Sequence, residues 1–374
     1  MNQSLTVASH WESSRLYADA EPFFDSILRA IASARFSVDF EYYIFELDVL
    51  GERFVTALLD AAARGVRVRV LIDGVGSLRD GTAISHRLTA GGVHVKIYHP
   101  LPWITESYRW SRRGGGFLYK FLVFLLNINR RDHRKLCVVD ELVAWVGSFN
   151  ITAAHLPVES GGLGWRDYGV ELKGPRITSL SAGFDSLWLR TRARLRRGFI
   201  ASYLSNRSLR ARALKNRFVA RSVVNARDRV WLVSAYFLPT AALRRALLHA
   251  CRSGAEVCLL LPERSDVVVF PLLSSHYYRE LLLAGARIFL YQPGVLHAKA
   301  LLIDDFAILG SSNWNYRSTL HDLELDVVLR DPSTLAELEQ FMRNDAVDSR
   351  ELTLEELRPP GLVSRLLYGL RYWM

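Results

Sequence analysis

A histidine, a lysine and an aspartate recur with the same spacing at two places in this sequence of 374 residues. Both places read H-x-K-x4-D and are followed by a G-S-x-N turn. The residues of the pattern are His133, Lys135, Asp140, Ser148 and Asn150 in the first copy, and His297, Lys299, Asp304, Ser311 and Asn313 in the second. The composition gives only about 0.02 expected chance matches to H-x-K-x4-D. Two copies therefore indicate an internal duplication that carries the same chemistry twice.

The spacing within each copy suits reactions of a phosphate ester. Residues i and i+2 of a strand point to the same face, so His133 projects together with Lys135, and His297 projects together with Lys299. A lysine and an asparagine can neutralise the non-bridging phosphate oxygens, where charge develops during transfer. Two histidines at one phosphorus supply a nucleophile and a general acid. The pattern therefore predicts one shared active site, but it does not say which histidine is the nucleophile.

The surrounding sequence predicts the elements that position the two motifs. Alternating apolar residues predict strands at 36–45, 66–74 and 93–100 in the first half, and at 228–239, 255–263 and 286–293 in the second. Helical spacing of apolar residues predicts a helix in each half, at 54–65 and 242–254. Because strands alternate with helices, we predict an α/β fold with mixed, largely parallel sheets.

We expect the duplication to divide the chain into two halves and further segments. The predicted units are an N-terminal half (1–175) with an aromatic and basic insert (101–131), a basic helical connector (176–227), a C-terminal half (228–358) and an amphipathic tail (359–374). Between residues 190 and 229 the only acidic residue is Asp228. The connector is therefore predicted either to be a solvated helix or to bind phosphates.

Composition restricts the partners and cofactors. The net charge is +10, from 48 basic and 38 acidic residues, which favours an anionic partner such as nucleic acid or an acidic membrane surface. The three cysteines form no C-x-x-C pair, and no cluster has the spacing of metal ligands, so we expect neither a disulfide scaffold nor a metal. No apolar stretch reaches the roughly 18–20 residues of a spanning helix, and we expect no signal peptide.

The doubled motif resembles that of the phospholipase D superfamily, from about Glu41 to about Arg330. The stretches RRDHRK (130–135), WRDY (165–168), VELKGP (170–175) and SAYFLP (234–239) are similar to bacterial cardiolipin synthases of the short type without N-terminal spanning helices. The resemblance implies a duplicated phospholipase D-like fold, with two α/β halves around a pseudo-two-fold axis and one active site at their interface. It also implies a covalent phosphohistidine intermediate and no metal or other cofactor.

The resemblance also implies roles for individual residues. Catalytic roles are expected for His133, Lys135, Asn150, Asp167, His297, Lys299, Asn313 and Glu324. Among these, Asp167 and Glu324 match carboxylates that hydrogen-bond the histidines, and Glu171 is an alternative to Asp167. The turn serines, Ser148 and Ser311, are expected to contact substrate. Structural bracing is predicted for Asp140 and Asp304, and Ser312 receives no role.

Two segments predict contact with a membrane. The insert holds aromatic residues together with arginines: Trp103, Trp110, Phe117, Tyr119, Phe121 and Phe124, flanked by Arg109, Arg112, Arg113, Arg130 and Arg131. In the tail, Leu362, Leu366, Leu370 and Trp373 share one helical face. The alternative for the tail is packing on the core. We expect a peripheral protein on the cytoplasmic face of the bacterial inner membrane.

The expected reaction is phosphatidyl transfer from one phosphatidylglycerol to another, which gives cardiolipin and glycerol. Phosphatidylethanolamine remains open as a donor lipid. The alternative enzyme is a phosphodiesterase of the same superfamily, either a lipid hydrolase or a nuclease. A non-catalytic lipid- or nucleic-acid-binding module is a third possibility, although binding alone does not require both histidines. The aromatic insert and the tail favour lipid, so no nucleic acid partner is expected.

Overall fold

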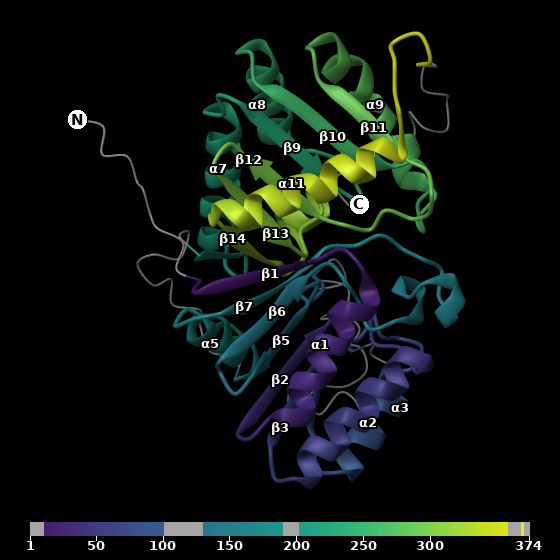
Figure 1. The fold of residues 1–374 in the computed structure, drawn as a ribbon, viewed down its shortest axis with the longest axis vertical. Helices are drawn as coiled ribbons and strands as arrows, with labels where there is room; N and C mark the ends of the chain where they lie inside the picture. The colour runs from purple at the N-terminus through teal and green to yellow at the C-terminus, as the bar shows by residue number, and fades with distance from the viewer. Residues whose placement is uncertain (1–10, 101–129, 190–201, 358–367, 370–374) are drawn as a thin grey trace, which may run out of the picture.

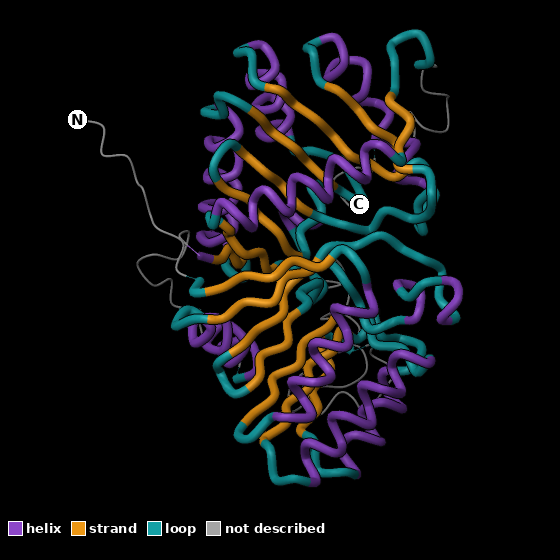
Figure 2. The backbone as a smooth tube through the Cα atoms, viewed as in Figure 1, coloured by secondary structure: helices purple, strands orange, loops and turns teal. Residues whose placement is uncertain are grey.

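Two α/β halves lie one above the other along the long axis of the molecule (Figure 1). The computed structural model describes residues 11–100, 130–189, 202–357 and 368–369. Most of the predicted insert and most of the predicted tail lie outside these described residues. Each half is built on one mixed sheet that is covered by helices, as the tube in Figure 2 shows.

The first half contains a seven-stranded sheet with the order β1-β7-β6-β5-β2-β3-β4. Its strands are β1 (Ser13–Tyr17), β2 (Ser37–Tyr42), β3 (Arg67–Asp73), β4 (His94–Tyr98), β5 (Leu136–Val139), β6 (Val143–Gly147) and β7 (Gly169–Lys173). Its helices are α1 (Ala20–Ser33), α2 (Val49–Ala63), α3 (Gly81–Ala90) and α5 (Ile177–Trp188), with short 3₁₀ turns η2 (Ala153–His155) and η3 (Val158–Ser160). Helices α1 to α3 cover one face, and α5 covers the other.

The second half contains an eight-stranded sheet with the order β15-β11-β10-β9-β12-β13-β14-β8. Its strands are β8 (Tyr203–Ser205), β9 (Arg229–Val233), β10 (Glu256–Pro262), β11 (Arg287–Tyr291), β12 (Ala300–Ile303), β13 (Phe306–Gly310), β14 (Leu325–Leu329) and β15 (Ser349–Glu351). Its helices are α7 (Leu209–Val224), α8 (Ala241–Arg252), α9 (Val269–Leu283), α10 (Tyr316–Leu320) and α11 (Pro332–Val347). The strand order of the first half recurs, with β15 added at one edge.

The duplicated α/β architecture with mixed sheets is confirmed. Most strands of each sheet run in one direction, but parallel ladders are confined to β2-β3-β4 and β9-β10-β11. The strands that follow the two motifs, β5 and β12, pair antiparallel with both neighbours. Each motif therefore leads into a strand in the middle of its sheet.

The segment that we predicted to be a basic connector packs differently from that prediction. Residues 177–188 form α5, which packs against β2, β5 and β6 of the first half. Strand β8 pairs with β14, and α7 packs on α8, so both belong to the second half. They occupy the places that β1 and α1 occupy in the first half. Residues 190–201 lie outside the described residues.

The core has three layers because the strands alternate between two buried faces. In β5, Leu136 and Val138 face a central core that both sheets share, whereas Cys137 and Val139 face the α1–α3 side. In β12, Ala300 and Leu302 enter the same central core. Helices α5 and α11 lie in this central layer, and α11 crosses in front of the second sheet in Figure 1. The shared core fixes the two motifs relative to each other.

Helix ends follow ordinary capping chemistry. Asp48 accepts hydrogen bonds from the backbone N–H groups of Leu50 and Gly51 and so begins α2. Thr240 caps α8 in the corresponding position, where its side chain accepts from the Leu243 N–H. Among the helices formed by the described residues, none is both long enough and apolar enough to span a bilayer.

Candidate active site

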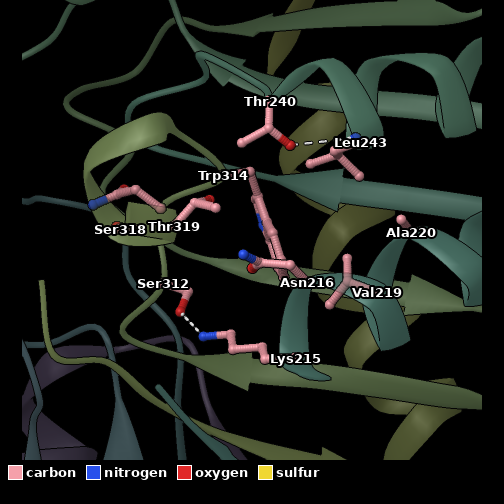
Figure 3. A pocket seen from close by; sticks show the side chains of 11 residues that line it. Lys215, Asn216, Val219, Ala220, Thr240, Leu243, Ser312, Trp314, Ser318 and Thr319 are labelled. Atoms are coloured by element: carbon pink, nitrogen blue, oxygen red, sulfur yellow. Dashed lines mark hydrogen bonds between the residues drawn. The ribbon is translucent and has the colours of Figure 1, made fainter. Parts of the chain in front are cut away.

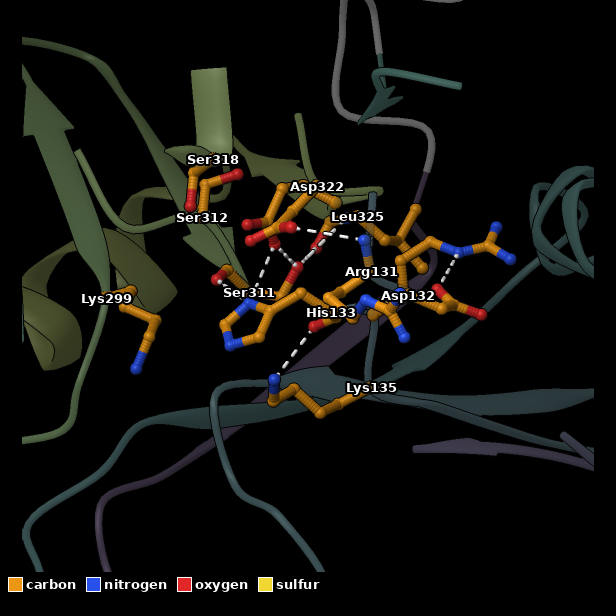
Figure 4. A network of polar contacts seen from close by, with 12 residues as sticks. Arg131, Asp132, His133, Lys135, Lys299, Ser311, Ser312, Ser318, Asp322 and Leu325 are labelled. Atoms are coloured by element: carbon orange, nitrogen blue, oxygen red, sulfur yellow. Dashed lines mark hydrogen bonds and ion pairs between the residues drawn. The ribbon is translucent and has the colours of Figure 1, made fainter. Parts of the chain in front are cut away.

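His133 lies directly before β5, and its imidazole reaches into the second half (Figure 4). Its Nδ1 lies 3.1 Å from the carbonyl oxygen of Ser311 and 3.1 Å from Oε2 of Glu324. A carbonyl oxygen can only accept, so Nδ1 carries the proton and the neutral ring has its lone pair on Nε2. The backbone N–H of His133 also donates to the carbonyl of Leu323 at 3.0 Å. Glu324 is thus held beside the histidine of the other half.

His297 repeats this arrangement in the opposite direction. It lies before β12 in the second half, and its Nδ1 is 2.6 Å from Oδ2 of Asp167, which belongs to the first half. Its backbone N–H donates to the carbonyl of Arg166 at 2.8 Å. Each histidine is therefore oriented by a carboxylate from the other half, and the two motifs form one site at the interface.

Both turn serines support these carboxylates. Ser148 donates its hydroxyl hydrogen to Oδ1 of Asp167, and Ser311 donates to Oε2 of Glu324. Both serines are fully buried. The predicted contact of these serines with substrate is therefore not what the structure shows, because the hydroxyl groups face the carboxylates instead. Glu171, the alternative to Asp167, accepts from the Tyr17 hydroxyl at 2.9 Å, whereas the carboxylates beside the histidines are those of Glu324 and Asp167.

The motif lysines lie behind the histidines. Lys135 donates from Nζ to the carbonyl oxygen of His133 at 2.8 Å, and Lys299 donates to the carbonyl oxygen of His297. Each ammonium group retains further protons for a substrate. Among the described residues, no partner is recorded for the buried Oδ1 atoms of Asn150 and Asn313.

The motif aspartates contact no histidine. Asp140 accepts hydrogen bonds from the three consecutive backbone N–H groups of residues 35–37, at 2.7 to 2.9 Å. Asp304 accepts from those of residues 227–229, at 2.9 to 3.0 Å. Both residues have a positive φ, 53° for Asp140 and 43° for Asp304. They hold the start of β2 or β9 against the hairpin that follows the motif, which is a bracing contact.

Comparison with known proteins shows the family of this chain. The family model described as "Cardiolipin synthase, PLD-like domain" matches residues 27–188 and 219–346. Cardiolipin synthase A of Pseudomonas aeruginosa is 32% identical over 355 residues, which cover 92% of this chain and 69% of that protein. Cardiolipin synthase A of Pseudomonas putida strain GB-1 is 31% identical over 363 residues, covering 94% of this chain and 72% of that protein. The chain belongs to the phospholipase D-like cardiolipin synthase family. It is a phosphatidyltransferase of phospholipids.

Solved structures show the same fold. Phosphatidylserine synthase from Haemophilus influenzae Rd KW20 superposes with a TM-score of 0.71 at 14% identity, covering 98% of this chain and 96% of that one. Polyphosphate kinase from Porphyromonas gingivalis gives a TM-score of 0.60 at 12% identity, covering 96% of this chain and 56% of that one. At these identities the likeness concerns the two-halved fold alone.

Burial dominates the electrostatics of this phosphatidyltransferase site. Desolvation lowers the pKa of His133 and of His297, and the nearby lysines lower both further. Burial also lowers the pKa of Lys135 to about 7, with a further contribution from Lys299, and that of Lys299 to about 8. Burial raises the pKa of Glu324 to about 7 and raises that of Asp167. A phosphate anion entering between the two lysines would favour their charged forms.

Two tyrosines in this site were not identified from the sequence. Tyr43 packs edge-on against His133 with ring centroids 4.8 Å apart, and Lys135 Nζ lies 5.1 Å from the Tyr43 ring centroid. Tyr236 makes the corresponding contacts, 6.2 Å from the His297 ring and 5.9 Å from Lys299 Nζ. Both follow the parallel strands β2 and β9. A search for aromatic residues directly after those strands could have found them.

A third histidine was also missed. His155, in η2, is buried and lies with its ring centroid 5.6 Å from that of His297. Its side chain, with those of Asp167 and His297, places one possible metal-ligand atom each within 4.8 Å of the others. The Asp167 and His297 atoms already bond each other at 2.6 Å.

Ser312, the variable residue of the second G-S-x-N turn, belongs to a buried network of polar side chains. Lys215 of α7 donates to Ser312 Oγ at 2.5 Å (Figure 3). Lys215 also forms an ion pair with Asp326 at 2.5 Å. Ser312 also donates to Asp326 at 2.8 Å. A small pocket beside this network is lined by residues of α7, α8 and the loop that contains Trp314.

Two further basic groups are not available to phosphates as we expected. Arg131, predicted to flank the membrane insert, is 1% exposed, and its Nη1 donates to the carbonyl of His99 at 3.0 Å. Arg212, in the predicted connector, donates to three backbone carbonyls at the end of α10 and in the loop that follows it. Both arginines therefore stabilise loops next to the site.

Proposed function

We propose that this chain catalyses phosphatidyl transfer between two phosphatidylglycerol molecules, with cardiolipin and glycerol as products, through a covalent phosphohistidine intermediate. The observation that carries the proposal is the crossed pairing of His133 with Glu324 and of His297 with Asp167. Each pairing fixes a proton on Nδ1 and leaves Nε2 for chemistry. The relatives named cardiolipin synthase A support the choice of lipid.

The geometry supports a mechanism in two steps. In the first step, Nε2 of one histidine attacks phosphorus, a nitrogen–phosphorus bond forms, and the bond to the glycerol oxygen breaks. The other histidine, protonated, gives its proton to that oxygen. In the second step, the histidine that gave its proton removes the proton from the free hydroxyl of another phosphatidylglycerol. The oxygen of that hydroxyl then forms the new bond to phosphorus, and the bond between phosphorus and the nucleophilic histidine breaks. Atoms and charge balance without a cofactor.

The surrounding groups support both steps. Lys135 and Lys299 donate to the backbone carbonyls of the motif histidines. The turn asparagines, Asn150 and Asn313, have buried side-chain oxygens without a recorded partner among the described residues. These donors would neutralise the non-bridging oxygens in the transition state. Glu324 and Asp167 would stabilise the imidazolium that forms on either side. The contact distances do not distinguish the nucleophile.

We also propose that the chain acts at the surface of an anionic membrane, as a peripheral protein of the cytoplasmic face. The net charge of +10 and the lipid substrate support this location. Only Tyr368 and Gly369 of the predicted tail are described, and the Tyr368 ring stacks on His276 of α9 at 4.4 Å. Deleting residues 361–374 tests the tail: weaker binding to phosphatidylglycerol vesicles with unchanged thermal stability would support membrane contact, whereas lost stability would assign it to packing.

The reaction is tested with purified protein and phosphatidylglycerol vesicles, with products identified by mass spectrometry. Cardiolipin and glycerol in equal amounts support the proposal. Phosphatidic acid in place of cardiolipin would support the alternative, a phospholipase D-type lipid hydrolase, because water would then be the acceptor. Protein carrying both His133→Ala and His297→Ala is the control for contaminating activity.

A further inference from the structure

His155 bridges two parts of the first-half site. Its Nε2 accepts a hydrogen bond from the backbone N–H of Asn150 at 3.1 Å. Its Nδ1 lies 3.4 Å from Oδ2 of Asp167, the same oxygen that faces His297 Nδ1 at 2.6 Å. The His155 side chain is fully buried, and its Nδ1 makes no closer polar contact with the described residues. This ring is therefore placed between a catalytic asparagine and the carboxylate that orients a catalytic histidine.

The contacts determine the tautomer of His155. Because Nε2 accepts the N–H of Asn150, that nitrogen carries no proton. Burial lowers the pKa of His155 to about 3, so its ring is neutral at working pH. A neutral imidazole then has its one proton on Nδ1, directed at the carboxylate of Asp167. A contact of 3.4 Å is long for a hydrogen bond, as catalytic contacts often are before substrate binds.

The other half has no imidazole at this place. His155 follows Asn150 by five residues, and Ser318 follows Asn313 by the same interval. Hydrogen bonding by the Ser318 side chain acts to lower the pKa of Glu324, although burial keeps that pKa raised. A small hydroxyl thus stands where the first half has a rigid ring. The additional group at the Asp167–His297 pair is therefore an imidazole, whereas the additional group at Glu324 is a hydroxyl.

We propose that His155 is a positioning residue that donates Nδ1–H to Asp167 and so keeps this carboxylate ionised and aimed at His297. The inference rests on the proposed transfer reaction, in which Asp167 stabilises the imidazolium of His297. His155 itself touches neither substrate nor the reacting atoms.

Other groups also act on Asp167. Lys299 and Lys135 face it and act to lower its pKa, as His155 does, while burial raises it. Ser148 and the backbone N–H of Tyr168 donate to its Oδ1. Asp266 acts on His297 from the side of Tyr236. Among the described residues, the hydrogen-bond and ion-pair contacts of Oδ2 come from His155 and His297, so the effect of His155 can be separated from that of the other donors.

Two substitutions separate the contacts of His155. In His155→Gln, the amide oxygen can reach the place of Nε2 and accept from Asn150, but the donor at Nδ1 is lost. In His155→Asn, the amide nitrogen can replace Nδ1 as donor to Asp167, but the acceptor for Asn150 is lost. Total consumption of phosphatidylglycerol is measured from pH 5 to pH 9, whichever product forms, together with the melting temperature of each variant.

We expect His155→Gln to lower kcat about 10-fold near neutral pH. Losing a donor raises the pKa of Asp167, so its ionised form is lost at a higher pH and the acid limb of the kcat profile moves upward. His155→Asn should keep the wild-type acid limb. Equal losses in both variants with unshifted profiles would overturn the proposal, because a structural role predicts that result. Wild-type protein that consumes no phosphatidylglycerol would instead contradict the proposed function.

A second measurement does not depend on activity or on the folding of variants. Nitrogen-15 NMR of histidine-labelled wild-type protein reports the tautomer of each ring. The proposal predicts that His155 remains neutral with its proton on Nδ1 between pH 5 and pH 8. A proton on Nε2, or protonation of the ring within that range, would overturn it.

Discussion

His297 meets Asp167 at 2.6 Å, whereas His133 shares its Nδ1 between Glu324 and the carbonyl of Ser311, both at 3.1 Å. Both halves of the site thus pair a histidine with a carboxylate, but the distance between the two groups differs. The shorter aspartate is held by a hydroxyl, a backbone N–H and a nearby imidazole, and the longer glutamate lacks the imidazole. The duplicated backbone gives the histidine and the carboxylate corresponding places in the two pairs, while the residues that contact the carboxylates differ.

The layer behind the two turns differs even more. In the first half, the variable residue of G-S-x-N is Phe149, which stacks on Phe23 of α1 at a centroid distance of 4.6 Å. In the second half it is Ser312, which bonds the buried pair of Lys215 and Asp326. One turn is therefore supported by aromatic packing and the other by an ion pair. Four predictions test how far this asymmetry extends to function.

The largest effect is expected from the histidines, where the two halves should behave alike. His133→Ala and His297→Ala should each lower turnover of phosphatidylglycerol roughly 10,000-fold or more, and the double variant should be no worse, because the two groups act as a unit. Initial rates measured by mass spectrometry check this, with melting temperatures as the control. A single variant that retains near-normal cardiolipin synthesis would rule out one shared site.

The carboxylates should separate the halves. Asp167→Asn should lower kcat about 1,000-fold and Glu324→Gln about 100-fold, because the shorter contact to His297 implies stronger coupling of that pair. Both changes keep the side-chain shape and remove the charge. The comparison is made at saturating lipid. Equal losses of kcat in the two variants would mean that the difference in contact distance does not affect catalysis.

The lysines predict a pH dependence. Burial lowers the pKa of Lys135 to about 7 and of Lys299 to about 8, so the free enzyme loses these cations as pH rises through that range. The protonated lysine is the active form, so kcat/KM should fall on the basic side. The bound phosphate raises both pKa values, so kcat should fall at a higher pH than kcat/KM. Identical basic limbs in the two profiles would contradict this reading of the site.

The smallest effects concern stability behind the turns. Phe149→Ala should lower the free energy of unfolding by about 3–5 kcal/mol through loss of packing. Lys215→Met should cost about 3–5 kcal/mol because it leaves Asp326 buried without its partner. The double change Lys215→Met with Asp326→Leu should recover most of that loss. Chemical denaturation measures all three, and a double variant that is less stable than the single one would show that the ion pair is needed for packing.

The sequence predicted the repeat because the two motifs share their local spacing. The family resemblance implied the carboxylates of Asp167 and Glu324, which lie beside His297 and His133. The pairing between halves could not be predicted in the same way. Asp167 follows Asn150 closely in sequence, yet its partner His297 lies 130 residues away. Residue spacing along a strand does not show which residues of the two halves contact each other. The aromatic residues Tyr43 and Tyr236 were also missed, since tyrosines at strand ends resemble ordinary core residues.

The predicted connector was misread for a physical reason. Helix α7 buries Arg212 and Lys215 where a surface helix usually buries apolar side chains, so its sequence resembles a solvated, basic segment. The counterion of Lys215 is Asp326, which lies 111 residues later in the sequence. A long-range ion pair of this kind leaves no periodic signal. Arg131 was misassigned to the membrane boundary for the same reason, because its burial depends on distant partners such as His99 and Asp73.

The claim that both halves form one site is tested most directly by counting covalent intermediates. Protein is mixed with radiolabelled phosphatidylglycerol, quenched on the millisecond scale, digested, and mapped by mass spectrometry. The account predicts at most one phosphatidyl group per chain, bound to the peptide of either His133 or His297 and never to both. This group should no longer form when the histidine that does not carry it and the carboxylate partner of that histidine are both replaced. Two groups per chain, one on each histidine, would contradict a shared site.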